Sequence, residues 1–261
     1  MNYIILTKNT QKREIPEGNI FFTTDRTIGR DSHILCNLLN ANGFARPHQV
    51  HKDNVVVVDH PERPEADAVI CNTPGLCVGV STADCIPVLV YDREHNAAAA
   101  IHAGWRGTKL RIVTKTLQKM AETYGTDPAA CEAVIGPGIE MKSFEVGDDV
   151  YEEFLAADFD LEFTAHSMPT GIGDYEKWHI DLKEINRQLL IESGVKECNI
   201  TVNLTDTFTD EQFFSARRER EPKGIRRILR KFMAAIIPQY KKKHPVKCGR
   251  IFSGFVLFDQ Q

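Results

Sequence analysis

The middle of the chain alternates short apolar runs with polar breaks. Each run has the length of a strand and is rich in β-branched or small apolar residues, and stretches such as ADC and DREHN separate the runs. This pattern is typical of consecutive strands. We therefore predict strands at 54–60, 76–81, 86–92, 97–103, 200–206 and 251–258.

Two other segments repeat their apolar residues at helical spacing. The first runs from Thr108, which suits an N-cap, to Gly125, which suits a C-terminal stop. The second runs in the same way from Asp181 to Gly194. Since strands outnumber helices and several follow one another directly, we predict an α+β fold. No internal repeat and no long linker divides the chain, so we expect a single domain over 1–261.

Composition fits a globular protein of the cytoplasm. Hydrophobic residues make up 42% of the chain and charged residues 26%. No run approaches the roughly 18 apolar residues of a membrane span, and the first residues lack the apolar core of a signal peptide. The seven cysteines are dispersed, odd in number and free of CxxC pairs. This usage favours a reducing compartment over a disulfide framework.

Cys85 and His102 are the strongest pair of candidate chemical groups. Cys85 precedes one predicted strand, and His102 lies near the end of the next. A hairpin folded at the middle of DREHN places them directly opposite each other, with Cβ atoms about 4.5–5.5 Å apart. A thiolate and an imidazole at this separation can share a metal ion or act as nucleophile and base. The residues leave both uses open.

The segment AGWRGT follows His102 and predicts a tight turn from strand to helix. Backbone amides at a helix start near Thr108, together with the guanidinium of Arg106, would favour an anion. The same residues also suit a plain turn with a capped helix and an exposed arginine.

A catalytic zinc site typically has three protein ligands and an open position. His51, directly before the strand predicted at 54–60, can supply the third ligand. The residues alone do not choose among the available histidines. The others with the same formal claim are His48, His60, His95 and His179.

A series of motifs resembles the laccase-domain family, which is also called multicopper polyphenol oxidase, peptidoglycan editing factor and purine nucleoside phosphorylase. TADC followed by HAGWRGT is the most specific part of the resemblance. The motifs, in order, are QVH (49–51), ADAVI (66–70), PGLCVGVSTADCIPVLVYD (74–92), IHAGWRGT (101–108), IGPGI (135–139), FEVG (144–147), DL (181–182), FFSARR (213–218) and CGRIFSGFVLF (248–258).

The resemblance implies a fold, a ligand set and an activity. The fold would have mixed and antiparallel sheets packed together with flanking helices. The metal ligands would be His51, Cys85 and His102, holding zinc, with copper as the other candidate. Asp84 would orient a histidine or act as acid or base, although a carboxylate in a turn can simply cap local amides. Arg106 would help to bind phosphate.

The implied enzyme is a zinc-dependent purine nucleoside phosphorylase that acts on adenosine, inosine and methylthioadenosine and also deaminates adenosine. Zinc would activate water or polarise the substrate. Its partners would be a purine nucleoside and phosphate, and neither nucleic acid nor a membrane span is expected. One alternative is a peptidoglycan-editing cysteine hydrolase that uses Cys85 and His102. Another is a copper polyphenol oxidase, although the nine histidines include no HxH pair of the kind that a multicopper cluster needs.

The sequence departs from the family at several positions. Gly138 stands in place of a cysteine, Phe144 replaces another aromatic residue, and Asp206 and Thr207 replace a Cys-Thr step. A basic insert of about 219–247 also follows FFSARR. We expect it to form an amphipathic surface helix that is dispensable for catalysis. Its charge would also suit an anionic surface or a second subunit.

Overall fold

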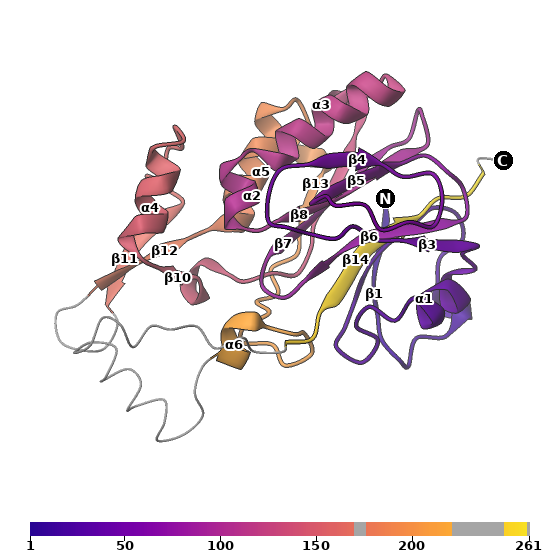
Figure 1. The fold of residues 1–261 in the computed structure, drawn as a ribbon, viewed down its shortest axis with the longest axis horizontal. Coiled ribbons are helices and arrows are strands. Elements are labelled where there is room, and N and C mark those ends of the chain that lie inside the picture. The colour runs from indigo at the N-terminus through magenta and orange to yellow at the C-terminus, as the bar shows by residue number, and fades with distance from the viewer. Residues whose placement is uncertain (170–175, 221–247, 260–261) are drawn as a thin grey trace.

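A computed structural model describes residues 1–169, 176–220 and 248–259 (Figure 1). The basic insert predicted at 219–247 therefore lies almost entirely outside the described residues, which include only its first two positions. Among the described residues, no helix combines the length and apolarity that a membrane crossing requires.

A six-stranded sheet carries the predicted hairpin at its centre. Its order is β13-β9-β7-β8-β5-β4, and it is mixed because the two outer pairs are parallel and the three inner pairs antiparallel. The strands are β4 (Val55–Val57), β5 (Ala68–Cys71), β7 (Ile86–Asp92), β8 (Ala97–Ala103), β9 (Glu132–Ile135) and β13 (Ile200–Val202).

A five-stranded sheet, in the order β1-β2-β14-β6-β3, is also mixed. Its strands are β1 (Asn2–Leu6), β2 (Ile20–Thr24), β3 (Gly43–Ala45), β6 (Leu76–Thr82) and β14 (Ile251–Val256). A small antiparallel sheet, in the order β10-β12-β11, stands apart in Figure 1. It consists of β10 (Glu145–Val146), β11 (Ala165–Pro169) and β12 (Glu176–Ile180).

The two large sheets pack face to face, with helices on their outer faces. One apolar cluster lies between the sheets and includes Phe21, Leu89 and Phe255. A second joins the six-stranded sheet to α3 and α5, and a third joins the five-stranded sheet to α1. The helices are α1 (Ser32–Leu39), α2 (Trp105–Lys109), α3 (Ile112–Tyr124), α4 (Asp148–Leu155), α5 (Leu182–Glu192) and α6 (Ala216–Arg220). This arrangement confirms the predicted α+β class with packed sheets and flanking helices.

The hairpin prediction is right in its strands and wrong in its register. β7 and β8 begin and end where predicted, but Pro87 rather than Cys85 faces His102. The reason is the turn: Asp92 pairs with Ala97, and residues 93–96 form the connection. Because side chains alternate between faces, a shift of two residues keeps Cys85 and His102 on the same face.

The first predicted helix also begins elsewhere. Gly104, not Thr108, is the N-cap of α2, and a left-handed residue at Arg111 (φ 57°) separates α2 from α3. Thr108 lies fully buried inside α2 and accepts a hydrogen bond from Asn186. Gly125 does end α3 in a left-handed conformation, and Asp181 caps α5 as predicted.

Candidate functional site

The side chains of Cys85, His102 and Asp67 lie together at the open end of the β7–β8 hairpin, at the edge of the core between the two large sheets. In β7, Leu89 points into the core between the sheets, so alternation puts Cys85 on the same face. His102 shares this face with Ala100 in β8. Asp67 precedes β5, and its backbone carbonyl accepts the amide of His102 at 2.8 Å. The sheet therefore positions all three side chains from strand ends.

His51 completes the group from outside the hairpin. One donor atom each from His51, Cys85 and His102 lies within 4.8 Å of the other two. The two imidazole rings meet edge to face, with centroids 4.8 Å apart. Zinc binds sulfur at about 2.3 Å and imidazole nitrogen at about 2.0–2.1 Å, so small side-chain movements would fit one ion to this donor set. Of the histidines that the sequence left open, His51 is the one placed here.

The approach of the backbone to Cys85 requires glycine. A Cβ atom built on Gly104 would lie 3.0 Å from the Cys85 sulfur and 3.7 Å from Cδ2 of His51. A side chain at position 104 would therefore crowd both candidate ligands. This gives the first glycine of AGWRGT a packing role next to the site, in addition to its place as N-cap of α2.

Asp67 holds two of the candidate ligands and was missed by the sequence analysis. It is fully buried, and the ring nitrogen Nδ1 of His102 donates to its carboxylate at 2.8 Å. The backbone amides of Val50, His51 and Lys52 donate to the same carboxylate at 2.8–3.1 Å. Such a partner fixes the tautomer of a ligand histidine and leaves its other nitrogen for the metal. A signal was present, since an aspartate directly before a buried strand is unusual.

Asp67 also holds His51 in a rare backbone conformation. His51 has a positive φ of 60°, which costs free energy in a residue other than glycine. The three amide hydrogen bonds to Asp67 stabilise this turn and aim the His51 ring at the thiol. The site is therefore built around a buried carboxylate.

The charges favour a thiolate at Cys85. Burial raises the pKa of the thiol, but the charge of His102 and hydrogen bonds from His102 and His51 outweigh burial and lower it below its usual value. Burial lowers the pKa of His102, and the charge of Cys85 together with the Asp67 carboxylate outweighs burial and raises it. A thiolate is both the form that binds a metal and the form that acts as a nucleophile.

Among the described residues, the hydrogen bonds of the Asp84 carboxylate go to Thr207 and Arg217 rather than to a histidine. Its carboxylate accepts the hydroxyl of Thr207 at 2.9 Å and the backbone amide of Arg217 at 2.6 Å. It also adopts a positive φ of 82°. Asp84 thus ties the start of α6 to the strand end that carries Cys85, while Asp67 is the carboxylate that contacts the ring of His102.

The candidate ligands open into a cleft of about 750 Å³ that is rich in arginine. Arg106 lines it from α2, with its guanidinium 4.1 Å from the centre of the Trp105 ring. The amide of Thr108 donates to the carbonyl of Gly104 at 2.8 Å inside α2, so it is not free to bind an anion, whereas Trp105 and Arg106 of the same segment line the cleft. Arg217, in α6, also lines the cleft.

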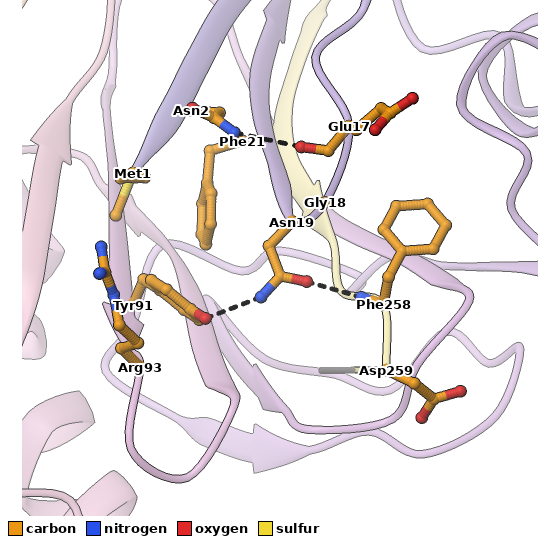
Figure 2. A pocket seen from close by; sticks show the side chains of 10 residues that line it. All are labelled: Met1, Asn2, Glu17, Gly18, Asn19, Phe21, Tyr91, Arg93, Phe258 and Asp259. Atoms are coloured by element: carbon orange, nitrogen blue, oxygen red, sulfur yellow. Dashed lines mark hydrogen bonds between the residues drawn. The ribbon is translucent and has the colours of Figure 1, made fainter. Parts of the chain in front are cut away.

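A second hollow, of about 830 Å³, lies at the turn end of the hairpin (Figure 2). Figure 2 shows Asn19 between Tyr91 and Phe258, and its side chain hydrogen-bonds to both. These contacts tie β2, β7 and the end of β14 together. The polar groups of this hollow thus hold chain segments in place, whereas those of the first cleft converge on a thiol.

Comparison with known families and proteins agrees with the motifs. A family model described as multi-copper polyphenol oxidoreductase laccase matches residues 24–229. A purine nucleoside phosphorylase of Bacteroides thetaiotaomicron is 42% identical over 185 residues, which cover 66% of this chain and 67% of that protein. Adenosine deaminase RL5, from an unknown prokaryotic organism, is 36% identical over 193 residues, which cover 69% and 71%.

Solved structures show the same fold at lower identity. YlmD from Geobacillus stearothermophilus superposes with a TM-score of 0.74 at 20% identity, covering 94% of this chain and 95% of that one. A Neisseria meningitidis protein superposes with a TM-score of 0.71 at 24% identity, covering 94% and 96%. The arrangement of two packed mixed sheets is therefore shared with these proteins.

Proposed function

Because this chain belongs to the multi-copper polyphenol oxidoreductase laccase family, we propose that it is a purine nucleoside phosphorylase that also deaminates adenosine. Its substrates are adenosine, inosine and methylthioadenosine, with orthophosphate as the second substrate of phosphorolysis. The observation that carries the proposal is the convergence of His51, Cys85 and His102 in an arginine-lined cleft. Relatives named for these two activities support it.

The donor set suits one zinc ion. Two imidazoles and a thiolate are ligands that zinc prefers, and the buried Asp67 supplies the carboxylate partner that ligand histidines usually have. A bound zinc ion would supply Lewis acidity to water or to the substrate. Copper binds the same ligand types, so elemental analysis must decide between the two metals.

The arginines give the cleft its anion-binding capacity. Phosphorolysis needs orthophosphate next to C1′ of the nucleoside. A guanidinium group can bind two oxygens of one phosphate through two parallel hydrogen bonds. Arg106 and Arg217 line the same cleft as Cys85. We assign these two residues to the attacking phosphate. Asp84 positions Arg217 through its backbone amide.

A cysteine hydrolase is the second candidate. The lowered pKa of Cys85 and the raised pKa of His102 describe a thiolate–imidazolium pair, which can attack a carbonyl without metal. A multicopper oxidase is disfavoured on ligands. Besides the His51, Cys85 and His102 set, the described residues offer one further donor cluster, at Asp59, His60 and Glu62, and it is not built of histidine pairs.

One experiment separates the three functions. The protein is purified without added metal, analysed for zinc and copper, and assayed with inosine plus orthophosphate, with adenosine, and with a phenol. We expect one zinc per chain, release of hypoxanthine only when phosphate is present, and conversion of adenosine to inosine. Copper with phenol oxidation would replace the proposal by the oxidase, and metal-free protein without nucleoside turnover would favour the hydrolase.

A further inference from the structure

The cleft is lined by further arginines besides Arg106 and Arg217. Arg46 follows β3, Arg63 lies in the loop before β5, and Arg30 directly precedes the N-cap of α1. All three line the same cleft as the candidate metal ligands. Three segments that are separate in sequence thus bring three arginines to one cleft.

The backbone fixes this group. The amide of Arg46 donates to the carbonyl of Glu62 at 3.1 Å, and the amide of His48 donates to that of Pro64 at 2.7 Å. These bonds place the segment of Arg46 beside that of Arg63, whose Nη2 lies 3.4 Å from Nδ1 of His48. The fold therefore fixes the backbone of Arg46 beside that of Arg63, although the Arg63 side chain is exposed.

Arg30 is held by its own turn. Gly29, in a left-handed conformation (φ 57°), directly precedes it, and the amide of Gly29 donates to the carbonyl of Asp25 at 2.8 Å. The hydroxyl of Thr24 donates to the Gly29 carbonyl at 2.5 Å. A Cβ at position 29 would lie 3.1 Å from the carbonyl oxygen of Arg250, so this turn packs against the residue that directly precedes β14.

The three positive charges have no carboxylate partner within the part of the chain that the structure describes. Of the acids adjacent to them in sequence, Asp31 accepts the amides of His33 and Ile34 as the cap of α1, and the carboxylate of Glu62 lies in a cluster with Asp59 and His60. Burial lowers the pKa of Arg46, and the charges of Arg30 and Arg63 lower it further, which shows that the three groups repel one another. Like charges held together without a counter-charge are unfavourable unless an anion binds between them.

We propose that Arg30, Arg46 and Arg63 form a second phosphate subsite, which binds a phosphate group besides the one assigned to Arg106 and Arg217. His51 lies five positions after Arg46, so the chain allows at most about 18 Å between their Cα atoms, and both residues line the same cleft. A nucleoside with phosphate on its 5′ carbon is the class of substrate that would use both the candidate ligands and this subsite. This assignment of the substrate class, nucleoside 5′-phosphates, rests on the nucleoside chemistry proposed above.

Phosphate can reach this subsite in two forms: as an ester group of the substrate or as free orthophosphate. Isothermal titration calorimetry separates them, with adenosine, adenosine 5′-phosphate and orthophosphate as ligands. The substitutions are Arg46→Gln and Arg63→Gln. Arg63 is exposed, so its variant tests the idea even if the half-buried Arg46 is needed for folding. Arg187→Gln is the matched control, because Arg187 pairs with Glu184 and Glu197 outside the cleft.

If the substrate carries the phosphate, the parental protein binds adenosine 5′-phosphate about tenfold or more tightly than adenosine, and both variants lose this preference. If orthophosphate is the ligand, the variants lose about tenfold in affinity for orthophosphate. Adenosine and adenosine 5′-phosphate then bind the parental protein with equal affinity. Either result supports the subsite. The proposal is overturned if the two variants bind each of the three ligands with the same affinity as the parental protein and the control. Because calorimetry needs no turnover, this failure is distinct from failure of the proposed enzyme activity.

Discussion

Two aspartate–histidine pairs occupy opposite ends of the β7–β8 hairpin. At the turn end, the ring of His95 lies 2.7 Å from the carboxylate of Asp92; at the open end, the ring of His102 lies 2.8 Å from Asp67. Both carboxylates are buried, and both also accept backbone amides of a neighbouring turn. In these respects the two ends of the hairpin are equivalent.

The pairs differ in what the imidazole meets on its other side. Nε2 of His95 faces the end of α3, where a Cβ on Gly125 would lie 3.5 Å away. His102 faces the Cys85 thiol and the His51 ring within an open cleft. An aspartate–histidine pair by itself therefore only stabilises the fold. It becomes a candidate for catalysis when a thiol and an accessible cavity lie beyond the ring.

The strongest test of this difference is Cys85→Ala. Removing the thiolate leaves two imidazoles, so we expect loss of bound metal and a fall in nucleoside turnover of more than about a hundredfold, beyond the effect typical of outer partners of a metal site. Cys198→Ala, at an exposed free cysteine, is the control. Metal content, turnover and circular dichroism are measured together. A metal-depleted Cys85→Ala protein that still splits inosine at the parental rate would place the chemistry elsewhere.

The next largest effect compares the two aspartates directly. Asp67→Asn removes the charge that orients His102 and replaces one of the two oxygens that accept the amides of the His51 turn, so metal affinity or activity should fall about ten- to hundredfold. Asp92→Asn changes the equivalent residue of the other pair and should leave metal affinity and kcat/KM unchanged. Competition with a chelator measures the affinity. Equal losses in both variants would mean that both pairs act only through stability.

Much of the fold could be predicted because local pattern coincides with tertiary structure there. β7 and β8 are apolar on both faces because one face meets the other large sheet and the other meets helices, and both have the bounds that were predicted. β1 and β2 were not predicted. They are parallel neighbours in a mixed sheet, and their pairing depends on β14, which lies more than 200 residues later.

The candidate ligands could be predicted from the sequence, whereas the strand register and the carboxylate that hold them in place could not. The motifs indicated His51, Cys85 and His102, and the structure brings these three together, although their role stays a proposal. The register error arose because the hairpin was centred too early in DREHN, whereas the paired residues Asp92 and Ala97 place the centre of the turn further toward the C-terminus. Asp67 was overlooked because its importance depends on contacts with residues up to 35 positions away.

A smaller effect is expected in the acid stability of the turn end. Burial raises the pKa of Asp92, but hydrogen bonds from His95 and its amide contribute to a net lowering below the ordinary value. A carboxyl group with a lowered pKa stabilises the fold above its unfolded pKa of about 4, and this stabilisation is lost as the pH falls through the folded value. Asp92→Asn should therefore lose about 1 kcal/mol near neutral pH. The difference from the parent should shrink below about pH 4, as followed by urea denaturation at several pH values.

The smallest effect is expected for His95→Gln. The ring of His95 is about one-third exposed, and its partner Asp92 keeps the amides of Glu94 and His95 as donors when the ring is removed. Partly exposed ion pairs contribute little, so the free energy of unfolding should change by less than about 0.5 kcal/mol. Metal content and turnover should equal those of the parent, in contrast to any change at His102. A His95→Gln protein with reduced metal content or reduced turnover would show that the two ends of the hairpin are coupled. The distinction between a structural pair at His95 and a functional pair at His102 would then be wrong.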